Sequence, residues 1–275
     1  MDKKVLTIQD ISCVGQCSLT VALPIISACG FETAILPSAV LSNHTAFSQF
    51  TFLDLTDEMP KIKEGWKEQG IEFSALYTGY LGNAKQIAIV KDIIGDCIEK
   101  GGPVIVDPAM ADCGNLYKGF DQNYVNSMKE LCAVADIILP NITEACLLTD
   151  TEYKTDLTPD YVETLIYKLS KICGGKIVLT GVSFDQNKNG VAVYEGSKIL
   201  YYEHDRVGGG CHGTGDVYAS AFVSALVSSK SVFESAKIAA DFTLLCIKNT
   251  VSHPEHWYGV KFEPMLKNLI EMINE

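Results

Sequence analysis

Short apolar runs of strand length alternate with longer helical segments along most of the chain, and this alternation limits the possible folds more than any other feature. Strands that alternate with helices form parallel βαβ units. The sequence therefore predicts an α/β protein, with a mostly parallel central sheet flanked by helices, in a single domain over residues 1–275. We expect strands at 5–9, 32–37, 75–80, 103–106, 137–139 and 177–180, a hairpin at 190–194 and 199–203, and helices at 19–29, 84–100, 124–132, 143–148, 158–172, 217–228, 232–250 and 262–273.

The segment 41–57, LSNHTAFSQFTFLDLTD, shows no clear periodicity. It fits either one exposed strand or a long loop. Long loops in compact domains often carry function, so this segment is a candidate part of a binding site.

A glycine-rich turn joins the last expected strand to the helix at 217–228. Such a turn leaves backbone N–H groups unpaired at a helix N-terminus, where the helix dipole favours phosphate. Asp216 is unexpected there, because a carboxylate repels the phosphate that Gly213, Thr214 and Gly215 would attract. An acid is explained if it accepts a proton from a hydroxyl that attacks the phosphate. Asp216 could instead be an ordinary N-cap, and the G-T-G-D pattern alone does not decide.

The same turn also satisfies G-x-G-x-x-G through Gly208, Gly210 and Gly213. In dinucleotide-binding folds this motif closes the first strand of a βαβ unit, with an acid about 20 residues further on. Here the motif follows a hairpin near the end of the chain, and Glu234 follows a helix rather than a strand. A dinucleotide-dependent oxidoreductase therefore ranks below phosphate transfer, and the Walker pattern G-x-x-x-x-G-K-[ST] is absent.

Polar residues follow the expected parallel strands at their carboxyl ends. Ligands of open parallel sheets bind beyond these ends. We therefore expect these residues to converge near the glycine-rich turn, which supports a site more strongly than any single motif. They are Gln9, Asp10, Thr78, Gly79, Tyr80, Asp107, Asn141, Thr180 and Gly181.

The net charge of −12 argues against nucleic acid or an anionic membrane as a partner. A phosphate site must then be built locally, from backbone dipoles, a metal or a few cations. Ten cysteines occur without a C-x-x-C pair, so neither a zinc ribbon nor a thioredoxin motif is indicated. Free cysteines, no signal sequence and no long apolar run predict a soluble cytoplasmic protein.

Six blocks spread over nearly the whole chain are VLTIQD, LSNHTAFSQF, YTGYLGNAKQ, VDPAMAD, ADIILPNITEACLL and HGTGDVYASAF. In this order they resemble the ribokinase-like superfamily and, within it, the pyridoxal kinases. The S-N-H-T block together with G-Y-L-G distinguishes pyridoxal kinases from sugar kinases of the same three-layer fold. The resemblance implies transfer of the ATP γ-phosphate to the 5′-hydroxyl of pyridoxal, pyridoxine or pyridoxamine, with Mg²⁺ as cofactor and K⁺ as a candidate monovalent cation.

On the phosphate side, the resemblance implies that Asp216 is the base that activates the hydroxyl. Gly213, Thr214 and Gly215 would form an anion hole for the moving phosphoryl group. The nucleotide-binding positions implied are Asp107, Asn141, Glu144, Thr180, Gly181, Thr214 and Gly215.

The resemblance also implies that Asp107, Asp112 and Glu144 hold Mg²⁺ and its waters, as hard oxygen ligands do. Two of the three keep ordinary alternatives. Asp112 could be a solvated loop acid, and Glu144 could be a first-turn acid of a helix.

On the substrate side, Thr45 and Tyr80 match ring-contacting positions of the family, and His44 beside them is interpreted as structural. Asp10 stands where the family usually has Ser, and its carboxylate could bond a protonated ring nitrogen or the 3-hydroxyl. Cys211 precedes the anion hole and could bind the pyridoxal aldehyde as a hemithioacetal, if the helix N-terminus favours its thiolate. A packed small residue is the alternative for Cys211.

The nearest alternative function is hydroxymethylpyrimidine (phosphate) kinase, which shares the fold and the chemistry. That family commonly has Cys where this chain has Asp216, and it lacks the S-N-H-T block. A carrier that binds pyridoxal phosphate without turnover is a third interpretation, which would need the base to be missing. The expected partners are a B6 vitamer, ATP and, from the superfamily resemblance, a second copy in a homodimer.

Overall fold

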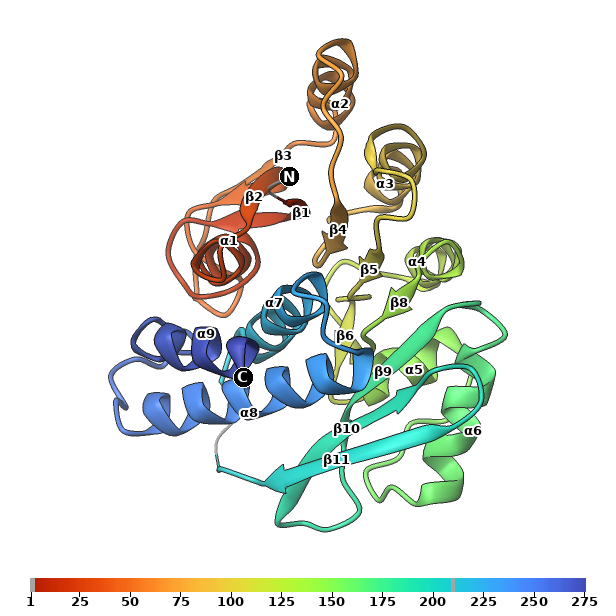
Figure 1. Ribbon diagram of the computed structural model, residues 1–275, viewed down its shortest axis with the longest axis vertical. Helices are drawn as coiled ribbons and strands as arrows, with labels where there is room; N and C mark the ends of the chain where they lie inside the picture. The colour runs from red at the N-terminus through yellow and green to blue at the C-terminus, as the bar shows by residue number, and fades with distance from the viewer. Residues whose placement is uncertain (1–2, 209–210) are drawn as a thin grey trace.

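The computed structural model describes residues 3–208 and 211–275, and it has the predicted alternation of strands and helices (Figure 1). Within these residues, one nine-stranded sheet has the order β11-β10-β9-β8-β5-β4-β1-β2-β3. Its six central strands pair in parallel, and they are β1 (Lys4–Ser12), β2 (Glu32–Leu41), β4 (Ala75–Thr78), β5 (Val104–Val106), β8 (Ile137–Ile138) and β9 (Lys176–Val182).

Antiparallel strands complete both edges of the sheet. One edge carries β3 (Phe52–Asp54), and the other carries the predicted hairpin β10 (Lys188–Tyr194) and β11 (Ile199–Asp205). The segment 41–57 is therefore mostly loop, with one short edge strand. A separate two-stranded ribbon, which the sequence did not indicate, joins β6 (Ala111–Asp112) to β7 (Asn115–Leu116).

Helices cover both faces of the sheet, so the predicted three layers are present (Figure 1). The two faces follow from the alternation of side chains along each strand: Leu6 and Ile8 belong to one core cluster and Val5 to the other. One face is covered by α1 (Leu19–Ala28), α7 (Thr214–Val227), α8 (Val232–Val251) and α9 (Leu266–Asn274), the last preceded by the 3₁₀ turn η1 (Glu263–Met265). The opposite face is covered by α2 (Met59–Glu68), α3 (Ala84–Cys97), α4 (Gln122–Ala133), α5 (Ile142–Leu148) and α6 (Pro159–Leu169).

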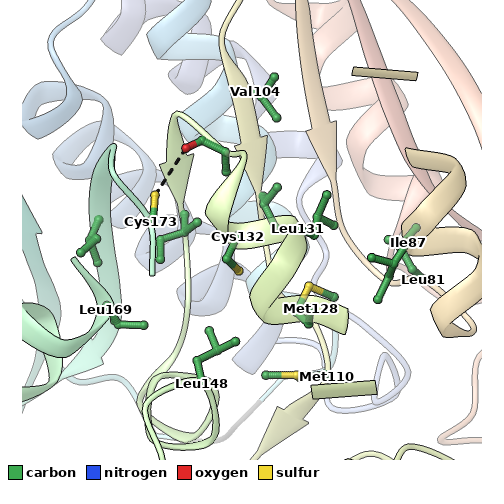
Figure 2. Packing of buried hydrophobic residues seen from close by; sticks show 14 of the residues in the cluster. Leu81, Ile87, Val104, Met110, Met128, Leu131, Cys132, Leu148, Leu169 and Cys173 are labelled. Carbon is green, nitrogen blue, oxygen red and sulfur yellow. Dashed lines mark hydrogen bonds between the residues drawn. The ribbon is translucent and has the colours of Figure 1, made fainter. Parts of the chain in front are cut away.

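The second face has a dense core of aliphatic and sulfur side chains (Figure 2). Met128, Leu131 and Cys132 of α4 are wholly buried there. The thiol of Cys173 donates a hydrogen bond to the Ala135 carbonyl, with 3.4 Å between sulfur and oxygen. These buried thiols behave as packing groups, which agrees with all ten cysteines being free.

One helix is not among the predicted elements. Helix α2 was missed, although Pro60 in its first turn and the apolar spacing of Met59, Ile62 and Trp66 are typical of a helix. Ser18 occupies the N-cap position of α1, although its side chain makes no cap hydrogen bond and its φ is +52°. No helix in the described part of the chain is long and apolar enough to cross a membrane.

Candidate active site

A cavity of about 550 Å³ lies at the carboxyl ends of the parallel strands. The structure brings every predicted site residue to its wall: Asp10, Thr45, Tyr80, Asp107, Asp112, Asn141, Glu144, Thr180, Gly181, Cys211, Gly213, Thr214, Gly215 and Asp216. Three other strand-end residues, Gln9, Thr78 and Gly79, do not line the cavity. Gln9 and Thr78 are fully buried, and a Cβ at Gly79 would lie 2.5 Å from Gln9 Oε1, so they pack beneath the cavity floor.

The N-terminus of α7 forms the glycine turn predicted to bind phosphate. Gly213 is the N-cap, with a left-handed φ of +80°, so Asp216 is not the cap and lies in the first turn. A Cβ at Gly213 would lie 1.9 Å from the Gln16 carbonyl oxygen, so glycine is required both for conformation and for space. The first helical bond runs from Val217 N to Gly213 O, which leaves the N–H groups before it free to bind an anion.

The dinucleotide alternative does not fit this topology. The turn follows β11, an antiparallel edge strand, rather than the first strand of a βαβ unit. Glu234 forms a capping box with Ser231 at the start of α8, so it serves a helix end. Gly210, the middle glycine of the motif, lies outside the described residues.

Asp216 has the properties of a general base. Burial raises the pKa of its carboxyl, the Ser18 backbone N–H opposes this shift and the nearby Asp10 charge adds to it, so that the pKa lies at about 7. A carboxyl with a pKa near the working pH can accept a proton efficiently. The left-handed φ of Ser18, unusual for a residue other than glycine, belongs to the turn that presents this N–H.

Asp107 and Glu144 place two more acids in the cavity. Burial, followed by the charges of Glu144 and Asp216, raises the pKa of Asp107 well above its usual value. Burial also raises the pKa of Glu144, to about 8, although backbone N–H groups oppose it. Both Glu144 oxygens accept from backbone, Oε1 from Met110 N at 3.1 Å and Oε2 from Asn141 N at 2.9 Å.

Asn141 and Glu144 form the capping box of α5. Glu144 is therefore an acid of the first turn of this helix, as its alternative interpretation proposed. The two backbone hydrogen bonds also leave Glu144 less free to ligate a metal directly. Asp107 accepts no side-chain or backbone hydrogen bond from the described residues, so its oxygens are available. Asp112 is exposed and accepts from Cys113 N at 2.8 Å.

Acidic side chains dominate the charge of the cavity wall. Among the described residues that line it there are five acids and no Lys or Arg; the acids are Asp10, Asp107, Asp112, Glu144 and Asp216. No group of three metal-ligating side chains occurs in the described part of the chain. A cation that enters with its own ligands, such as Mg²⁺ on phosphate oxygens, fits this wall.

The substrate-side wall contains Asp10, Thr45 and Tyr80. Asp10 is 5% exposed and accepts from Ser12 Oγ at 3.1 Å, and burial raises the pKa of its carboxyl. Burial also raises the pKa of Tyr80 to about 12, so its hydroxyl stays protonated and can donate. Burial raises the pKa of the Cys211 thiol as well, which favours the thiol over the thiolate, and the hemithioacetal at Cys211 stays a prediction.

Other lining residues were missed from the sequence. His44 was interpreted as structural and His212 received no role, yet both line the cavity and their rings stack. The cavity wall also includes a stripe of α8 that no motif marks. Its residues are Ala240, Thr243, Leu244 and Ile247, whose helical spacing was the available signal.

The profile of the phosphomethylpyrimidine kinase family matches residues 57–260, and the chain belongs to this family. A crystal structure from Bacteroides thetaiotaomicron, classed as a phosphomethylpyrimidine kinase and containing pyridoxal, is 37% identical with a TM-score of 0.93. That likeness covers 98% of this chain and 96% of the other. Pyridoxal kinase from Lactobacillus plantarum is 27% identical, with a TM-score of 0.91 over 98% and 97% of the two chains.

Among the sequence relatives, pyridoxal kinase from Dictyostelium discoideum is 28% identical over 200 residues, which cover 70% of this chain and 64% of the relative. The chain is thus a kinase with the ribokinase-like fold. The predicted fold class and family resemblance are confirmed, while the roles of single residues remain predictions.

Proposed function

We propose that this protein uses ATP to phosphorylate the 5′-hydroxyl of pyridoxal, pyridoxine or pyridoxamine. One observation carries the proposal: a single cavity joins the glycine turn and Asp216 to a wall made by Asp10, Thr45 and Tyr80. The phosphate acceptor and the phosphate donor can therefore meet at one carboxylate. The Bacteroides structure resembles this chain over nearly its whole length, and the pyridoxal that it contains supports the choice of acceptor.

In the proposed reaction, Asp216 accepts the proton of the vitamer hydroxyl as its oxygen forms a bond to the γ-phosphorus. The bond between that phosphorus and the bridging oxygen breaks, and ADP leaves with the electron pair. Backbone N–H groups of Gly213, Thr214 and Gly215 would donate to the oxygens of the moving phosphoryl group. Asp107, Asn141, Glu144, Thr180 and Gly181 would surround the rest of the ATP.

Asp107 is the residue best placed to hold Mg²⁺, because its oxygens accept no hydrogen bond from the described residues and none of the described lining residues is Lys or Arg. Mg²⁺ keeps several of its own waters and needs only one or two protein carboxylates. Its chemical contribution is to neutralise phosphate charge. Asp112 and Glu144 would act through its waters, Glu144 with both oxygens already bonded to backbone.

Hydroxymethylpyrimidine (phosphate) kinase activity is the second candidate, favoured by the family description that matches residues 57–260. Both candidates need a flat heteroaromatic alcohol and the same phosphate turn. Purified protein with ATP and Mg²⁺ should form the phosphate esters of the B6 vitamers. Turnover restricted to hydroxymethylpyrimidine would overturn the substrate assignment, and turnover of neither would overturn the kinase proposal.

We also propose that residues 1–275 act as one kinase domain, and that two copies form a homodimer in the cytoplasm. Support for the dimer comes from edge strand β3, where Phe52 and Leu53 are 48% and 60% exposed. Sedimentation should show a dimer, and Leu53→Lys should weaken it. A monomer for the unchanged protein at micromolar concentration would contradict this assembly. The free cysteines suit a reducing compartment.

A further inference from the structure

His44 is held firmly in the loop that follows β2, one residue before Thr45. Its side chain is buried, with 2% exposure, and it lines the cavity. Its backbone N–H donates to the Val14 carbonyl at 3.2 Å, and its carbonyl accepts from Phe47 N at 3.1 Å. The loop that carries Thr45 is thereby fastened to the loop between β1 and α1.

The ring nitrogens of His44 both have partners. Nε2 lies 2.6 Å from the Tyr258 carbonyl oxygen, which can only accept, so Nε2 carries the proton and donates. Nδ1 accepts from the Ala46 backbone N–H at 3.2 Å. These partners select one neutral tautomer and join the substrate-side loop to a segment 214 residues further along the chain.

The face of the His44 ring stacks on His212. The ring centroids lie 4.1 Å apart and the planes differ by 28°. A Cβ at Gly15 would lie 2.0 Å from His44 Cδ2, so the ring also packs closely against the backbone there. His212 immediately precedes Gly213, the cap of the phosphate turn. One rigid contact therefore links the substrate wall to the phosphate turn.

We propose that His44 is a positioning residue. Through its stack on His212, it fixes the position of the wall at Thr45 relative to the turn at Gly213. This inference rests on the proposed function, since the relative position of wall and turn matters for bringing the acceptor hydroxyl to Asp216. His44 needs no contact with the reacting atoms for this role. A misplacement of about 1 Å between reacting groups can cost roughly 100-fold in rate.

The charge states suit a permanent stack. His212 is partly exposed to solvent, yet the loss of hydration beside the His44 ring, followed by the nearby His44, lowers the pKa of His212, so His212 is neutral at physiological pH. Two neutral imidazoles stack without repulsion, whereas two imidazolium ions would repel each other.

The kinetic test separates the stack from the hydrogen bonds. His44→Gln and His212→Gln each remove the stack, and we expect kcat to fall roughly 30-fold while the KM for ATP changes less than about twofold. His44→Phe keeps a ring on His212 and should recover most of kcat. Phe47→Leu is the matched control, since the Phe47 ring centroid lies 4.9 Å from that of His44 and Phe47 does not line the cavity, and its kcat should stay near that of the unchanged protein.

A double-mutant cycle gives the decisive comparison. If one stack carries both effects, the double variant His44→Gln with His212→Gln should be no slower than the slower single variant within about twofold. Losses that multiply would overturn the proposal, and so would a His44→Phe variant as slow as His44→Gln. Melting temperature and ADP affinity of each variant verify that the fold is retained.

A measurement without turnover separates this inference from the proposed function. Imidazole ¹⁵N spectra of the unchanged protein should show His44 protonated on Nε2, and its signals should move in His212→Gln. Signals of His44 that are unaffected by His212→Gln would overturn the stack, whichever alcohol the enzyme uses. Failure of the unchanged protein to phosphorylate any vitamer would contradict the proposed function alone.

Discussion

The two halves of the cavity are built in different ways. The phosphate half uses the backbone of one turn, from Gly213 to Asp216. Its carboxylates lie at the ends of strands or in the first turns of helices. The substrate half is assembled from loops distant in the sequence, with His44 bonded to Tyr258 and stacked on His212. Substitutions in the first half should therefore abolish the reaction, whereas those in the second should change its efficiency and its choice of alcohol.

The largest effect is expected from Asp216→Asn, which removes the base but keeps a side chain of nearly the same shape. Turnover should fall by roughly 1000-fold or more, because general-base catalysis contributes on that order. ATP binding, measured by calorimetry, should survive. Turnover close to that of the unchanged protein would remove the base role and with it the distinction between the two halves.

Gly213→Ala should have the next largest effect. The added Cβ meets the Gln16 carbonyl, and φ of +80° disfavours any residue other than glycine, so the turn must move. We expect kcat to fall roughly 100-fold and stability to fall by about 2 kcal/mol or more. Gly208→Ala is the matched control, because a Cβ there has open space and no left-handed φ. Equal effects of the two substitutions would contradict a special role for the Gly213 turn.

Asp10→Asn tests the substrate half. The change removes a buried carboxylate from the wall, and the KM for at least one vitamer should rise roughly tenfold while kcat changes less. Asp54→Asn, at an acid that does not line the cavity, serves as the control. Unchanged KM values for all three vitamers in Asp10→Asn would remove this residue from the substrate wall. A matching loss of kcat would instead show that the two halves are not separable.

The smallest effect concerns stability and pH in the protein without ligands. Asp216 has a folded pKa of about 7, above its value in the unfolded chain, so the folded state binds more protons between these values. Stability should therefore fall as pH rises from about 4 to about 7, and Glu144, whose folded pKa is about 8, extends this loss to about pH 8. Asp216→Asn should raise the melting temperature by several degrees near pH 8. An equal melting temperature for both proteins would contradict the raised pKa of Asp216.

The phosphate half could be predicted almost completely from the sequence. The G-T-G-D turn, Asp107 and Asn141 each follow a recognisable strand, and strand ends of parallel sheets converge. The choice between an N-cap and a first-turn acid at Asp216 needed the backbone, because both interpretations use the same four residues. The structure assigns the cap to Gly213.

The substrate half could be predicted only in part. Thr45 and Tyr80 came from the family resemblance, whereas the contacts of His44 join positions 44, 212 and 258, which no local pattern relates. No motif of either half marks the α8 stripe at Thr243 and Leu244, which looks like any buried helix face in the sequence. Helix α2 was missed because its signals lie beside an irregular loop, not because they are absent.

A competition assay tests the central claim most directly. Pyridoxal and hydroxymethylpyrimidine are supplied together at equal concentration with ATP and Mg²⁺, and mass spectrometry follows both phosphate esters from one reaction. The ratio of products then equals the ratio of kcat/KM for the two alcohols. We predict a large excess of pyridoxal phosphate; an excess of hydroxymethylpyrimidine phosphate would contradict the assignment of the substrate half while leaving Asp216 and the phosphate turn in place.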